Sequence, residues 1–106
     1  MFALHPKLEQ DTLPVAGLEL CTVRLMNDHR FPWLILIPHR DGITELHQLS
    51  RPDQQQLVLE SSRAAVALEQ VFAPDKINIG ALGNLVPQFH WHVVARTRSD
   101  RCWPGP

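Results

Sequence analysis

The sequence predicts an α+β domain in which an antiparallel sheet packs beside one long helix. Short segments on both sides of the middle of the chain alternate apolar and polar residues or are continuously apolar, as strands do. Between them, apolar residues recur every three or four positions over a long stretch, as in an amphipathic helix. The connections are short, which favours strands that pair antiparallel around the helix.

The first part of the chain is predicted to hold a short helix and two strands. The helix, over 5–12, should stop at Leu13-Pro14, because proline disfavours helical backbone in the residue before it. Residues 18–26 alternate in polarity and predict a strand. Residues 33–37 are large and apolar between two prolines, which indicates a strand buried on both faces.

A long helix is predicted to begin at Ser50 and to end at Ala73-Pro74. Ser50 can cap the helix, and Asp53 can complete a capping box. Pro52 falls in the first turn, where its missing N–H costs nothing. A helical turn or two is expected just before, within 43–49. The residues expected on the buried face of the long helix are Leu57, Ser61, Ala64, Leu68, Val71 and Phe72.

The last part of the chain is predicted to hold two more strands, over 76–81 and 88–95. Side chains two residues apart share a face of a strand. Gln88, His90 and His92 should therefore point to one side of the second strand, and its large apolar residues to the other. The tail after Ala95 contains three arginines that we expect to be solvated: Arg96, Arg98 and Arg101.

Composition excludes several classes of function. The chain has 106 residues and a formal net charge of −1, so we expect a single domain over 1–106 and no polymeric nucleic acid partner. We expect no membrane partner, because no stretch is apolar for long enough to cross a bilayer. Cys21 and Cys102 are too few for a disulfide scaffold. Two reduced thiols and no secretory signal predict a cytoplasmic protein.

His90 and His92 allow three interpretations from the residues alone. An imidazole held on a strand can attack phosphorus near neutral pH. Two histidines at i and i+2 can instead bind zinc, if His39, His47 or Asp28 supplies the remaining ligands. They can also be structural, partly buried and hydrogen-bonded.

A resemblance to a known family covers most of the chain in the right order. Segment 88–94, QFHWHVV, resembles the His-φ-His-φ-His-φ-φ signature of the histidine triad (HIT) family. Segment 78–87, NIGALGNLVP, looks like the family's Gly-rich strand and loop before the triad. Segment 34–38, LILIP, resembles its buried strand, and 46–54, LHQLSRPDQ, its entry into the long helix. The resemblance implies a HIT-like fold with about five antiparallel strands, one long helix and one or two short helices.

The resemblance also implies a reaction: hydrolysis or transfer of a nucleotidyl group from a nucleoside phosphoramidate or a dinucleoside polyphosphate. His90 matches the nucleophile that takes up the nucleotide, and His92 matches the histidine that contacts the phosphate. Gln88 occupies the first triad position. The displacement needs no metal and no cofactor, and the expected partners are a small-molecule nucleotide and a second copy of the chain in a homodimer.

Further positions match residues that bind the nucleotide. Asn27, with Asp28 beside it, matches the polar residue that binds the ribose, although Asn27 also suits a turn. Asn78 and Asn84 match amides that hold the phosphate or the leaving group. Gly83 and Asn84 lie in a loop whose backbone N–H groups can hold phosphate oxygens, although Asn84 also suits a turn with positive φ.

Three positions depart from the family pattern: Gln88, Trp33 and Leu85. Glutamine donates and accepts hydrogen bonds but cannot carry a proton on and off. Trp33 stands where many members have histidine, and Leu85 where several have a hydroxyl residue. The alternatives to an enzyme are therefore a nucleotide-binding module with little catalysis and a zinc protein built on His90 and His92.

Overall fold

The predicted α+β class is confirmed by the computed structural model, which describes residues 2–106. The sheet is antiparallel throughout, as predicted, and one long helix crosses it. The elements in chain order are α1 (Pro6–Asp11), β1 (Thr12–Gly17), β2 (Cys21–Met26), β3 (Trp33–Pro38), the 3-10 turn η1 (Leu46–Gln48), α2 (Arg51–Phe72), β4 (Lys76–Gly80) and β5 (Trp91–Arg96).

The strand order places the C-terminal strand in the interior of the sheet. The order is β1-β2-β3-β5-β4, so β5 lies between β3 and β4 although it comes last in the chain. His92 is paired with Ile35 of β3 on one side and with Gly80 of β4 on the other. Such a position fixes the backbone of His92 on both sides, which a loop would not do.

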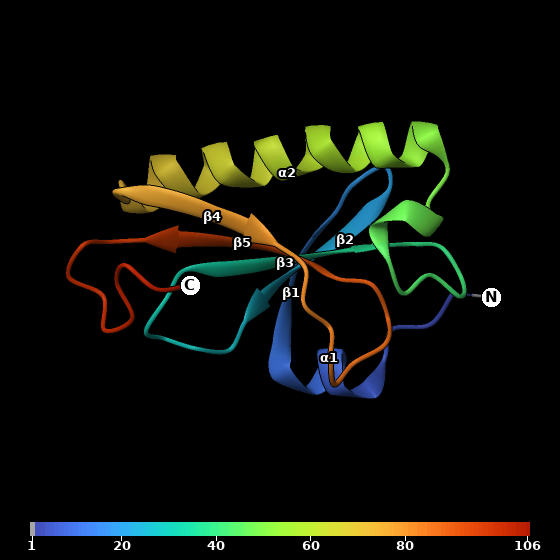
Figure 1. The fold of residues 1–106 in the computed structure, drawn as a ribbon, viewed down its shortest axis with the longest axis horizontal. Helices are drawn as coiled ribbons and strands as arrows, with labels where there is room; N and C mark the ends of the chain where they lie inside the picture. Colours follow the sequence, from blue (N-terminus) through green and yellow to red (C-terminus); the bar gives the residue numbers. More distant parts are fainter. Residues whose placement is uncertain (1) are drawn as a thin grey trace.

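The two faces of the sheet are covered differently. Helix α2 packs along one face, and α1 with the N-terminal segment lies on the opposite side (Figure 1). Strand β3 is buried on both faces, as predicted: Leu34 to Ile37 are at most 9% exposed. The smaller core on the α1 side contains Leu8, Ile35 and Ile37 and leaves part of that face open.

Helix α2 begins and ends as predicted, with one difference at each end. The Ser50 side chain accepts from the backbone N–H of Asp53 at 3.2 Å, but the Asp53 carboxylate pairs with Arg40 at 2.7 Å. At the other end, Ala73 has φ 47° and ψ 55°, the left-handed conformation that ends many helices. The expectation that Val71 and Phe72 are buried is wrong: both are exposed, because Leu68 is the last residue of α2 that packs into the helix-side core.

The strands differ from prediction at the edge and at their ends. Strand β1 was not anticipated, because it is an exposed edge strand interrupted by Pro14 and by a register shift against β2. Strand β5 begins at Trp91 rather than at residue 88. Gln88 and His90 therefore precede the strand, in a segment whose backbone bonds elsewhere, such as Phe89 N–H to Ile43 O at 2.9 Å.

Within residues 2–106 the structure contains no helix that is long and apolar enough to cross a membrane. Both cysteines are free thiols, Cys21 buried in the core and Cys102 exposed near the C-terminus.

Candidate active site

His92 lies on the face of the sheet away from α2. Its neighbours in β5, Trp91 and Val93, belong to the helix-side core, so alternation turns His92 to the other side. Its Nδ1 accepts a hydrogen bond from Nε1 of Trp33 at 2.9 Å. Burial, with a smaller contribution from the neighbouring His90, lowers the pKa of His92 to about 4. His92 is therefore a neutral imidazole at pH 7.

His90 lies directly before β5 with only 8% of its surface exposed. Its Nδ1 is 2.7 Å from the carbonyl oxygen of Gln88. A carbonyl can only accept, so Nδ1 must carry a proton, and the lone pair of the Nδ1–H tautomer lies on Nε2. The His90 and His92 rings meet edge to face with centroids 4.9 Å apart. The two predicted histidines thus form one pair.

Gly83 brings the loop before β5 close to the His90 ring. Its φ is +73°, which disfavours other residues, and a Cβ there would lie 3.7 Å from Cε1 of His90. The same Cβ would lie 3.2 Å from the carbonyl oxygen of Val86. The positive φ in this turn belongs to Gly83 and not to Asn84. The loop can therefore approach the ring because residue 83 has no side chain.

The Gln88 side chain holds the N-terminal segment. Its Oε1 accepts from the backbone N–H of His5 at 2.7 Å, and its Nε2 donates to the carbonyl oxygen of Ala3 at 2.8 Å. The amide thus bridges two residues more than 80 positions away in the sequence. It is the backbone of Gln88, not the side chain, that hydrogen-bonds the His90 ring.

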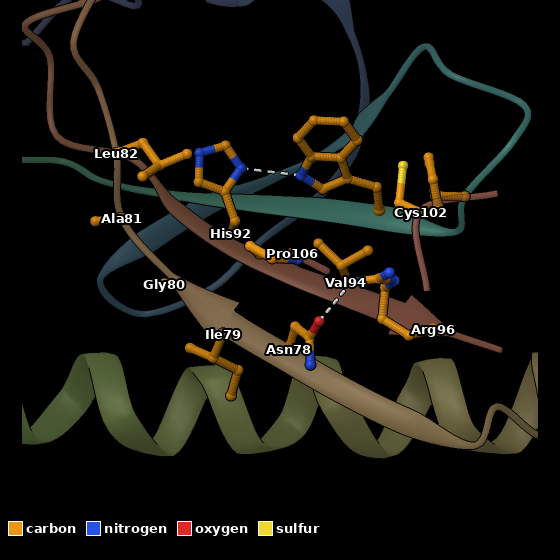
Figure 2. A pocket seen from close by; sticks show the side chains of 12 residues that line it. Asn78, Ile79, Gly80, Ala81, Leu82, His92, Val94, Arg96, Cys102 and Pro106 are labelled. Carbon is orange, nitrogen blue, oxygen red and sulfur yellow. Dashed lines mark hydrogen bonds between the residues drawn. The ribbon is translucent and has the colours of Figure 1, made fainter. Parts of the chain in front are cut away.

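A cavity of about 390 Å³ adjoins His92. Figure 2 shows His92 with Leu82 at one end of this cavity and Arg96 with Cys102 at the other. Its volume suits a small organic ligand, and its wall is mostly apolar. The lining residues are Phe31, Trp33, Asn78, Ile79, Gly80, Ala81, Leu82, His92, Val94, Arg96, Cys102 and Pro106.

His90 does not line this large cavity but an adjoining hollow of about 40 Å³. Gly83 and Gln88 also line the hollow, and Ala81 and Leu82 line both spaces. The larger space therefore adjoins His92 directly, and Ala81 and Leu82 lie between it and the hollow beside His90.

Arg96 closes the far end of the cavity and is not solvated, so the prediction for it is wrong. It is 4% exposed, and its guanidinium donates to Asp100 at 2.7 and 3.1 Å, to Oδ1 of Asn78 at 2.7 Å and to the Gly105 carbonyl at 2.7 Å. The hydrogen bond from Arg96 lowers the pKa of Asp100 to about 2. The ring of Trp103 lies 5.9 Å from the guanidinium carbon. Arg96 thereby fixes the C-terminal tail against the sheet.

Asn78 is oriented by Arg96. Because a guanidinium only donates, the amide oxygen of Asn78 must face it, at 2.7 Å. The NH₂ group is then left for another acceptor beside the cavity that Asn78 lines. The predicted ligand amide is thus placed at the site with a defined orientation.

Three predicted residues lie outside both spaces: Asn27, Asp28 and Asn84. Asn27 is exposed, and its backbone N–H donates to Asp11 O at 2.9 Å. The Asp28 carboxylate pairs with Arg30 at 2.6 Å, and hydrogen bonds from Arg30 lower the pKa of Asp28 to about 2. Asn84 is exposed in the loop before β5.

Sequence analysis missed two features of the site. The hydrogen bond from Trp33 to His92 joins residues 59 positions apart. Arg96 bonds Asn78, 18 positions before it, and Gly105, 9 positions after it. Trp33 was visible only as a departure from the family pattern. Nothing in the sequence distinguishes Arg96 from the exposed Arg98 and Arg101 that follow it.

The zinc alternative lacks further ligands in this arrangement. Over residues 2–106, no group of three or more His, Cys, Asp or Glu side chains is placed to hold a metal ion. His39 instead contacts the Thr22 hydroxyl and stacks on Phe2 with centroids 4.5 Å apart. Asp28 is paired with Arg30, and His47 is exposed in η1.

Comparisons with known proteins agree on one family. The family model described as HIT domain matches residues 7–99. A histidine triad protein of known structure from Sinorhizobium meliloti 1021 is 50% identical with a TM-score of 0.96, and the match covers 99% of this chain and 78% of that one. One from Bradyrhizobium japonicum is 43% identical with a TM-score of 0.96, over 99% and 78% of the two chains.

A third histidine triad protein, from Marinobacter aquaeolei VT8, is 45% identical with a TM-score of 0.96, over 100% of this chain and 77% of that one. A search of curated protein sequences finds no significant match.

Proposed function

Because the chain belongs to the HIT domain family, we propose that it is a nucleotidyl hydrolase or transferase acting on nucleoside phosphoramidates or dinucleoside polyphosphates. Members of that family are nucleotide-binding hydrolases and transferases. One observation supports the specific mechanism: the hydrogen bond from Nδ1–H of His90 to the Gln88 carbonyl, at 2.7 Å. It leaves the lone pair on Nε2, beside a neutral His92.

In the first step, Nε2 of His90 attacks the α-phosphorus of the nucleotide. A bond forms between Nε2 and phosphorus, and the bond from phosphorus to the leaving amine or phosphate breaks. The leaving group keeps the electron pair of that bond, and a leaving amine takes a proton from solvent water. The ring gains positive charge, which the Gln88 carbonyl stabilises through Nδ1–H. In the second step, water or another acceptor attacks phosphorus and gives up a proton to the solvent, and Nε2 leaves with the electron pair of its bond to phosphorus.

The groups around the histidine pair suit the charge that develops on phosphate oxygens. His92 accepts at Nδ1, so its proton lies on Nε2 and can be donated. The NH₂ of Asn78 and the backbone of Gly83 supply further N–H donors. The nucleoside would then lie along the apolar wall of the larger cavity. Parts of the nucleotide that project beyond both spaces would contact the remaining predicted residues, which are Asn27, Asp28 and Asn84.

Gln88 has a supporting role in this proposal. Both ends of its amide are used on the backbone of Ala3 and His5, and an amide cannot relay a proton. The chemistry then depends on His90 and His92, with the backbone of Gln88 orienting the nucleophile.

The proposal includes a homodimer, for which the outer surface of α2 and the edge strand β4 supply exposed apolar residues. Leu59 is 61% exposed, and Ile79 is 48% exposed. Such area favours association. Sedimentation should give the mass of a dimer for the wild type and of a monomer for Leu59→Asp. Val15→Asp, at a position of the opposite edge strand β1 that is 54% exposed, is the matched control and should leave the mass unchanged.

The two free cysteines favour the predicted cytoplasmic location, because thiols stay reduced there.

Calorimetry with AMP and a hydrolysis assay with AMP phosphoramidate test the proposed function together. The wild type should bind AMP and release ammonia from the phosphoramidate, whereas His90→Asn should bind AMP and release none. Residue 88 is glutamine, which cannot relay a proton, where the family signature has histidine. This difference favours a second candidate function, a nucleotide-binding module without catalysis. Binding of AMP without turnover, unchanged in Gln88→His, would establish the binding module and overturn the enzyme.

A further inference from the structure

Trp33 contacts His92 across neighbouring strands. Trp33 opens β3 and is paired with Val94, so His92 lies diagonally from it on the same face. The two ring centroids are 5.5 Å apart, and the indole Nε1 is 2.9 Å from Nδ1 of His92. This hydrogen bond is drawn as the dashed line at His92 in Figure 2.

The chemistry of the two rings makes this contact directional. An indole N–H is a donor only, so Nδ1 of His92 must offer its lone pair. A proton on Nδ1, whether in the other neutral tautomer or in the imidazolium, would place two N–H groups against each other. The contact therefore permits only one form of His92, the neutral ring with its proton on Nε2.

We propose that Trp33 is a positioning residue that acts through His92, holding it as a neutral donor whose Nε2–H is presented to the phosphoryl group. This inference rests on the proposed function for the identity of the acceptor. The form of His92 itself rests only on the 2.9 Å contact.

The surroundings fit a site that recognises phosphate with neutral donors. The cavity contains one permanent cation, Arg96, whose guanidinium is engaged with Asp100, Asn78 and the tail. The carboxylate of Asp100 also compensates its charge. What remains near the histidines is a set of N–H groups without formal charge. His92 can serve there only if its proton lies on the nitrogen opposite Trp33.

The test is the protonation form of His92, measured from its ring ¹⁵N signals in long-range ¹H–¹⁵N spectra at neutral pH. The wild type should show an unprotonated Nδ1 and a protonated Nε2. Trp33→Phe keeps an aromatic ring but removes the donor, so the proton should distribute over both nitrogens. Trp91→Phe is the matched control, because the indole N–H of Trp91 has no hydrogen-bond partner among residues 2–106. It should leave the His92 signals in the wild-type pattern.

Kinetics supply the second readout. Trp33→Phe should lower kcat roughly tenfold to a hundredfold, the loss seen when the hydrogen-bond partner of a metal-binding histidine is removed. Trp91→Phe should change kcat far less. A wild-type His92 protonated at Nδ1, or a Trp33→Phe spectrum identical to the wild type, would overturn the inference even in an active enzyme. The expected spectra in a protein without turnover would support the Trp33 contact and count against the proposed function alone.

Discussion

The two ends of the cavity carry nitrogen-rich side chains that are used in opposite ways. At one end lies His92, with His90 in the adjoining hollow, and each histidine uses one ring nitrogen for a fixed partner and keeps the other for a ligand. At the other end, the guanidinium of Arg96 donates hydrogen bonds to Asp100, Asn78 and the Gly105 carbonyl of the tail. The comparison shows that the formal charge of the cavity belongs to the end whose donors are already used. Under the proposed function, the chemistry takes place at the end that keeps unused donors and lone pairs.

The protonation states differ in the same way. The hydrogen bond with Asp100 raises the pKa of Arg96, so its charge is permanent. Burial, with His90 as a smaller cause, lowers the pKa of His92 to about 4, so its ring is neutral. One end is a fixed charge pair that holds structure, and the other contains the neutral ring of His92.

The largest expected effect comes from removing the nucleophile. His90→Asn should lower kcat by roughly four orders of magnitude or more, since no other lone pair replaces Nε2. Circular dichroism and AMP binding should stay near wild type, because His90 belongs to neither hydrophobic core. An activity within tenfold of wild type would place the chemistry elsewhere.

Breaking the charge pair between Arg96 and Asp100 should lower the stability of the fold. Arg96→Met leaves the Asp100 carboxylate without its partner and frees the tail, so Tm should fall by roughly 10 °C. Arg98→Met is the matched control in the same segment. Because Arg98 is exposed, that change should shift Tm by only about 1–2 °C. Equal Tm values for the two variants would remove the distinction between the two ends of the cavity.

Acidification should destabilise the protein through His92. Its pKa is about 4 in the folded chain against an ordinary value of 6.5, so between these values the unfolded state binds the proton and the folded state does not. The free energy of unfolding should therefore fall as pH drops from 6.5 to 4, by about 1–2 kcal/mol after allowance for the partly open ring. Urea unfolding across this range measures it. The decrease should be smaller in His92→Gln, and an equal decrease there would assign it to other groups.

The smallest effect is expected for Gln88. Gln88→His should change kcat by less than about threefold, because the side chain contacts the N-terminal segment and the backbone carbonyl that orients His90 is kept. A steady-state assay of the two proteins measures it. A large gain in the histidine variant would show that position 88 takes part in proton transfer.

Sequence alone sufficed for the elements whose local pattern agrees with their burial. The apolar run of β3 and the Ser50 cap of α2 are examples, because period and capping are local properties. Sequence patterns did not predict exposure or burial where these depend on how the elements pack. Leu13 and Val15 are exposed on an edge strand, and Val71 is exposed in the last turn of α2, beyond the helix-side core. Within the site, His90 and His92 follow from spacing, whereas the burial of Arg96 depends on a tail that returns to the strand.

The most direct measurement is the identity of the residue that carries the nucleotide during turnover. The enzyme is mixed with AMP phosphoramidate, quenched in alkali and digested, and the peptides are analysed by mass spectrometry. The predicted result is AMP bound to His90, stable in alkali and lost in acid. Turnover with the nucleotide on another residue, or with none on His90 at any quench time, would contradict the account.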